Sequence, residues 1–163
     1  MTNQTKQAAG TFSWNPFVKI NDEEHANSLA RDGGAICAGL LAFTYVVNIA
    51  LLAFGGVSLW SEDPSAAAQI GHFVGLVLAV FIGWRIWVRQ PLWALCFVLI
   101  WLIAETADKA LLGATGAVRL TPFSFFINVV GLVVAIQAIR GRMWINAERK
   151  RNRDAALKAE IDH

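Results

Sequence analysis

The sequence is short of charge, of cysteine and of recognisable catalytic motifs. Only 16% of its 163 residues are charged, whereas soluble domains hold about a quarter. Its two cysteines, Cys37 and Cys96, lie far apart and outside any C-x-x-C motif, so they indicate neither a disulfide nor a metal site. No Gly-rich phosphate loop, G-x-S-x-G or H-E-x-x-H motif is present. We therefore expect no catalytic residues, no metal and no cofactor, and we do not expect an enzyme.

Hydrophobic residues, in contrast, are in excess and make up 56% of the chain. They gather in four segments, each long enough to cross a membrane as a helix at ~1.5 Å per residue, and none alternates with the period of a strand. The third segment crosses fully only if it includes Glu105, Asp108 and Lys109. The four predicted spans are 35–57, 66–87, 91–112 and 122–139. The sequence thus predicts an all-α integral membrane protein, a four-helix transmembrane bundle over residues 35–139.

The segment before the first span, residues 1–34, is predicted to stay at the membrane surface. Asn21 followed by Glu24 resembles a capping box, which predicts a short helix that ends near Asp32. The pair Gly33–Gly34 would then bend the chain into the membrane. We interpret this short helix as an interfacial anchor, with a docking arm for a partner as the alternative.

The distribution of basic residues predicts the direction of the spans. Of the 14 Lys and Arg residues, all except Lys109 and Arg119 fall in segment 1–34, in the link 85–89 or in the tail 140–163. Because cytoplasmic segments carry the excess of Lys and Arg, these three regions are predicted to be cytoplasmic. Both termini are therefore expected on the cytoplasmic side, and every Trp except Trp101 falls near a predicted membrane interface.

The tail after the last span is predicted to be a basic cytoplasmic helix. Its basic residues could attract anionic lipid at about 1 kcal/mol each, or could simply set the orientation and remain solvated. The residues concerned are Arg149, Lys150, Arg151 and Arg153. No stacking aromatics or known nucleic-acid fold accompany this run, so nucleic acid is not an expected partner.

A stripe of small residues marks the second predicted span. Gly71, Gly75, Ala79 and Gly83 recur at every fourth position, which places them on one helix face and lets another backbone approach closely. The stripe either packs inside a monomeric bundle or forms a seam with a second copy or with another membrane protein.

One polar residue in each span falls at a similar depth. Counted from the predicted cytoplasmic ends, Asn48, His72, Glu105 and Asn128 lie about 17–22 Å into the membrane. Such residues are costly in lipid and tend to face the bundle interior. They could fix helix register, or His72 and Glu105 could form a charge-assisted pair that relays a proton. Glu105 could instead pair with Lys109, four residues later.

Three stretches of the chain resemble small four-helix proteins of bacterial inner membranes that have no assigned function. The stretches are Arg85–Trp93, Glu105–Lys109 and Phe126–Ile127–Asn128 onward to Arg140–Gly141. The resemblance implies the four-helix architecture and a bacterial inner membrane, and it carries no catalytic motif. The four-helix multidrug exporters fit less well, because their membrane-embedded Glu lies early in the first helix, where this sequence has no acid.

These observations favour a non-catalytic accessory or scaffold subunit that packs on other membrane helices, with the lipid bilayer and another membrane protein or a second copy as partners. The alternative is a small homo-oligomeric transporter or channel that uses the polar layer, His72 and Glu105 above all. An intramembrane enzyme with an unseen cofactor is a third, weaker hypothesis.

Overall fold

The computed structural model describes residues 15–17, 19–54, 66–114 and 122–161, and this part of the chain consists of helices with short connections and contains no strand. The elements are α1 (Glu23–Ser28), a π-helical turn (Leu29–Gly33), α2 (Gly34–Ala53), α3 (Ala66–Arg89), α4 (Leu92–Ala114) and α5 (Pro122–Ile161). The predicted all-α class is confirmed. Residues 1–14 of the predicted N-terminal segment and 55–57 of the first predicted span lie outside the described residues.

Three helices are long and apolar enough to cross a membrane: Glu23–Leu51, Ile70–Arg89 and Phe125–Ile161. This finding indicates that the protein associates with a membrane. α4 has 23 residues, but three charged residues, Glu105, Asp108 and Lys109, lie in its second half, and it is not among these three helices.

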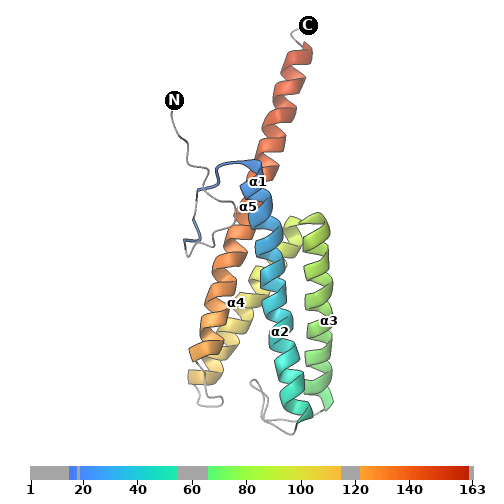
Figure 1. Cartoon of the computed structure of the whole chain (residues 1–163), viewed down its shortest axis with the longest axis vertical. Coiled ribbons are helices and arrows are strands. Elements are labelled where there is room, and N and C mark those ends of the chain that lie inside the picture. Colours follow the sequence, from blue (N-terminus) through green and yellow to red (C-terminus); the bar gives the residue numbers. More distant parts are fainter. Residues whose placement is uncertain (1–14, 18, 55–65, 115–121, 162–163) are drawn as a thin grey trace.

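Helix α2 occupies the centre of the bundle. α3 packs along one side of α2, α5 packs along the other side, and α4 packs mainly against α5. Figure 1 shows α4 starting beside the end of α3 and passing behind α2 toward the start of α5. α3 and α4 consequently contact each other little. The main core contains Cys37, Leu41, Ala79, Ile82, Ile86, Ala94, Leu95, Val98, Leu102, Val134, Ala135 and Ala138.

The N-terminal helix differs from the predicted one in its cap and in its direction. Its N-cap is Asp22, not Asn21, and the Asp22 carboxylate accepts a hydrogen bond from the backbone N–H of His25 at 2.7 Å. The predicted bend at Gly33–Gly34 is wrong, because Gly34 has right-handed helical dihedrals and α1 continues through the π-helical turn into α2 (Figure 1).

The two glycines in this turn serve close packing. A Cβ on Gly33 would lie 3.3 Å from Val134 Cγ1 of α5, and a Cβ on Gly34 would lie 2.5 Å from Ile86 Cγ2 of α3. A π-helical turn holds one more residue than an α-turn and so changes the register of the residues after it. As a result, adjacent glycines both face neighbouring helices, one on each side of α2.

Helix α5 is one continuous helix of 40 residues, with no break where the last predicted span ends at residue 139. Near this position it meets the N-terminal part of the chain. Gln137 Nε2 donates to the backbone carbonyl of Asn15 at 2.9 Å, and Arg140 donates to the carbonyl of Pro16 at 2.8 Å. A second buried cluster, Ala26, Ala30 and Ile145, joins α1 and the π-helical turn to α5. Beyond it, α5 extends away from the bundle (Figure 1).

Candidate functional site

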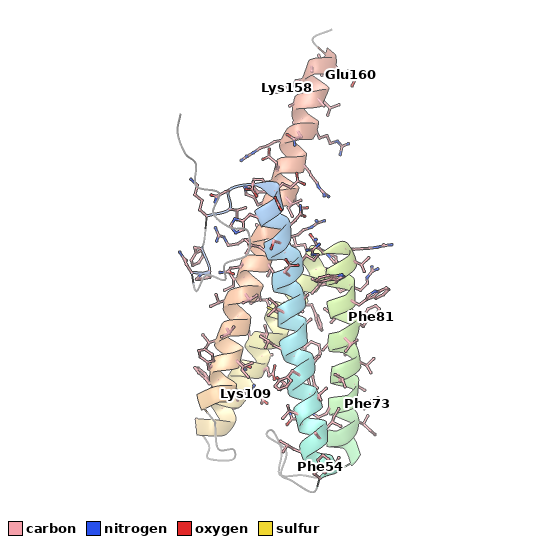
Figure 2. All side chains as sticks on the ribbon, in the orientation of Figure 1. Phe54, Phe73, Phe81, Lys109, Lys158 and Glu160 are labelled. Carbon is pink, nitrogen blue, oxygen red and sulfur yellow. The ribbon has the colours of Figure 1, made fainter. Side chains whose placement is uncertain are left out.

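A buried ion pair lies between α4 and α5. Lys109 Nζ is 3.5 Å from Glu105 Oε1, and the two side chains are only 7% and 9% exposed. Lys109 Nζ also donates to Asn128 Oδ1 at 3.1 Å, and Asn128 Nδ2 donates to Thr106 Oγ1 at 3.2 Å. These four side chains form what we call the polar centre. Figure 2 shows Lys109 near the end of the bundle opposite the α5 extension.

The spacing along α4 explains how this centre forms. Glu105 and Lys109 are four residues apart, so they lie one turn apart on the same face of the helix. Thr106, next to Glu105 on the helix, donates its own proton to the carbonyl of Leu102 at 2.6 Å and uses its oxygen to accept from Asn128. The second carboxylate oxygen of Glu105, Oε2, is buried and has no hydrogen-bond partner.

An aromatic group lies beside the polar centre and connects α2, α3 and α4. Trp101 Nε1 donates to Tyr45 Oη at 3.1 Å, and the two ring centroids are 5.8 Å apart. The Tyr45 ring lies 6.1 Å from the ring of His72, and Phe97 meets the edge of Trp101 at 5.5 Å. A Cβ on Gly75 would lie 2.7 Å from the Tyr45 ring, so the glycine makes room for that ring.

The structure brings two of the four predicted layer residues together. Glu105 and Asn128 meet through Lys109. Asn48 is fully buried and donates to the carbonyl of Thr44 at 3.0 Å. His72 lies beside Tyr45, its Nε2 is buried without a partner, and no ion pair joins it to Glu105 among the described residues. The predicted His72–Glu105 pair is therefore not formed, whereas the Glu105–Lys109 pair is.

The predicted small-residue stripe faces the chain's own α2 over most of its length. A Cβ on Gly83 would lie 3.0 Å from Ala38 Cβ, Gly75 lies against Tyr45, and Ala79 belongs to the buried core. Gly71 is exposed, and a Cβ there would meet nothing within 4 Å. The structure thus places three of these four residues in contacts within one chain.

The basic tail residues lie on the exposed part of α5. Arg149, Lys150, Arg151 and Arg153 are all exposed, and Arg151 makes a 3.3 Å ion pair with Glu148 one turn earlier. Lys158 and Glu160 mark the far end of the same helix in Figure 2.

The sequence analysis did not identify Tyr45, whereas it named Lys109 as a possible partner of Glu105. Tyr45 is the only tyrosine of the chain, and Trp101 is the only tryptophan outside the predicted interfaces, so their types and positions could have indicated a pair. For Lys109, the i,i+4 spacing to Glu105 was the available signal.

The site offers a buried carboxylate with one oxygen unpartnered, an ammonium that contacts Glu105 and Asn128, and aromatic rings one helical turn away on α4. No group of three or more His, Cys, Asp or Glu that could hold a metal occurs among the residues described. The resemblance to small four-helix inner-membrane proteins stays a prediction, because no family model, no curated protein and no solved structure matches this chain.

Proposed function

We propose that the protein is a non-catalytic accessory subunit that crosses a bacterial inner membrane four times. The buried ion pair supports the fourth crossing. Charged side chains are costly when they face lipid, but Glu105 and Lys109 of α4 are buried and form an ion pair, which leaves Asp108 as the exposed charge of this segment. Outward, the helices present large apolar side chains; on α3 these include Phe73 and Phe81, on the side away from α2 (Figure 2). Such a surface suits contact with lipid.

The arrangement of the helix ends supports cytoplasmic termini. The start of α1, the link from α3 to α4 and the extension of α5 all lie at the same end of the bundle (Figure 1). Arg31, Arg89 and Arg140 are at this end, and Arg31 also stacks on Trp87 with 5.0 Å to the ring centroid. Basic residues beside an aromatic belt are typical of the cytoplasmic interface.

The extension of α5 is the observation that carries the accessory role. Residues 146–161 continue α5 for about 24 Å beyond the second cluster, and all of them are exposed except Glu148, which is half-buried. A helix of this length is marginal in water by itself, so a binding partner would supply the packing that stabilises it. Because most of the small-residue stripe faces α2, this extension is the better docking element. Its basic run would at the same time lie near anionic headgroups.

Affinity purification from the host's own membranes in a mild detergent tests this proposal. We expect a distinct membrane protein to co-purify with the full chain at a fixed ratio. A chain that ends after Asn146 keeps the buried Ile145 contact but should lose the partner. If the full chain purifies alone or only with copies of itself, the accessory role is wrong.

A small transporter is the second candidate function, and the unpartnered Oε2 of Glu105 favours it. A buried carboxylate with a free acceptor can take up a proton or a cationic substrate inside the membrane. In proteoliposomes we expect Glu105→Gln to abolish proton-linked flux while the protein stays folded. Asp108→Asn is the matched control, because Asp108 is an exposed acid on the same helix and its loss should leave the flux unchanged. Equal flux in wild type and Glu105→Gln would contradict a transport role.

A further inference from the structure

The unpartnered carboxylate oxygen and the aromatic group lie on the same face of α4. Trp101 and Glu105 are four residues apart, so the indole and the carboxylate succeed each other by one helical turn. Tyr45 accepts a hydrogen bond from Trp101 Nε1, and its ring lies beside that of His72. The carboxylate is therefore one helical turn from a set of rings contributed by three helices.

The group that lacks a partner here is an acceptor. Lys109 is held by both Glu105 and Asn128, and Asn128 is in turn held by Thr106. Glu105 Oε2 is the polar-centre atom that is buried without a hydrogen bond. Leaving such an atom unpaired in an apolar environment is costly, and the charge of a positively charged ligand would lower that cost. An anion would gain nothing, because it would approach the carboxylate.

The surroundings also select a hydrophobic ligand. Phe97 is exposed on the membrane side of the aromatic group, while Tyr45, His72 and Trp101 are half-buried. α3 and α4 contact each other little, so entry of a lipid-soluble molecule between them would disturb fewer helix–helix contacts than entry between α2 and α3. Aromatic faces attract cations, and desolvated cation–π contacts are the stronger ones.

We propose that Tyr45, Trp101 and Glu105 form a binding site for a hydrophobic organic cation that enters from the bilayer between α3 and α4. The aromatic rings would contact the apolar body of the ligand, and Glu105 Oε2 would face its positive charge. Lys109 competes for the same carboxylate but stays anchored by Asn128. The His72 ring lies 6.1 Å from the Tyr45 ring, and Asp108 is exposed on α4. This inference rests on the second candidate function and names its substrate class.

Equilibrium dialysis of the purified full chain in mild detergent, with radiolabelled tetraphenylphosphonium as the probe, tests the site. Tetraphenylborate, an anion of the same size and shape, is the matched ligand control. We expect saturable binding of the phosphonium and none of the borate. Glu105→Gln should weaken phosphonium binding about tenfold or more, because the charge partner is buried. Asp108→Asn should leave the affinity unchanged.

Should Glu105→Gln fail to fold, Trp101→Leu gives a second test, because it removes the ring and keeps the carboxylate; we expect about a tenfold weaker affinity there as well. Absence of saturable phosphonium binding to the wild type, or equal binding of the borate, would overturn the site. Unchanged binding by a folded Glu105→Gln variant would overturn it equally.

Flux in proteoliposomes separates this inference from the transport proposal. Saturable phosphonium binding without flux supports the site and contradicts a transporter. Proton-linked flux without phosphonium binding supports a transporter and contradicts this substrate class.

Discussion

Replacing Gly141 with alanine is expected to lower the free energy of unfolding by about 1–3 kcal/mol, although alanine is the better helix former. The new Cβ would lie 2.6 Å from the carbonyl oxygen of Ala26, 3.1 Å from Leu29 Cβ and 3.2 Å from the backbone nitrogen of Ala30. Two of these three atoms belong to the backbone of the N-terminal helix. These short contacts of the new Cβ can be relieved only if α5 and the N-terminal helix move apart. That movement loosens the cluster of Ala26, Ala30 and Ile145.

Gly39→Ala is the matched control for this prediction. It makes the same chemical change within a helix, but a Cβ at this exposed glycine meets nothing within 4 Å. We expect Gly39→Ala to be neutral or to stabilise by up to about 1 kcal/mol. Thermal unfolding of the purified protein in detergent, followed by circular dichroism at helical wavelengths, measures both variants. Equal melting temperatures for the two would show that the close approach at Gly141 does not constrain the fold.

The helical class follows from the sequence because hydrophobic run length is a local property. Segment 66–87 is predicted as a span and is found as α3, Ala66–Arg89, since an uninterrupted apolar run specifies a helix wherever it packs. The path of the N-terminal helix is not a local property. From the sequence alone, two adjacent glycines favour a bend. In the structure, Gly33 and Gly34 instead allow α5 and α3 to approach α2 from two sides. The choice between a bend and a continuous helix is made by these tertiary contacts.

The polar site was predictable in its residue types but not in its partners. Depth counting gives the height of Glu105 and Asn128 along their helices, because the rise per residue is fixed, and both side chains are buried in the structure. It contains no information about the rotation of each helix about its axis. That rotation turns Lys109 toward Asn128 and His72 toward Tyr45. It also decides that Glu105 pairs within its own helix, at 3.5 Å, and not across to α3.

Removing the ammonium from the polar centre is expected to have the largest effect of any single substitution considered for this protein. Lys109→Met should lower the free energy of unfolding by about 3–5 kcal/mol, because it leaves the buried Glu105 carboxylate without its counterion. Asn128 loses a donor in the same variant. Glu105→Gln should also destabilise, since the buried Lys109 ammonium then loses its ion pair with Glu105.

The double variant Glu105→Gln with Lys109→Met is expected to recover most of this loss, to within about 1 kcal/mol of the wild type, because no uncompensated charge remains.

Arg151 and Glu148 provide a matched pair for comparison. Their separation of 3.3 Å is similar to that of the buried pair, but the side chains are 76% and 34% exposed. Water screens such a pair, so its double-mutant cycle should give about 0.2–1 kcal/mol. Titration with a denaturing detergent in mixed micelles measures both cycles. A coupling energy for Glu105 and Lys109 no larger than the exposed pair's would show that the polar centre is hydrated, and would remove the support it gives to a fourth membrane crossing.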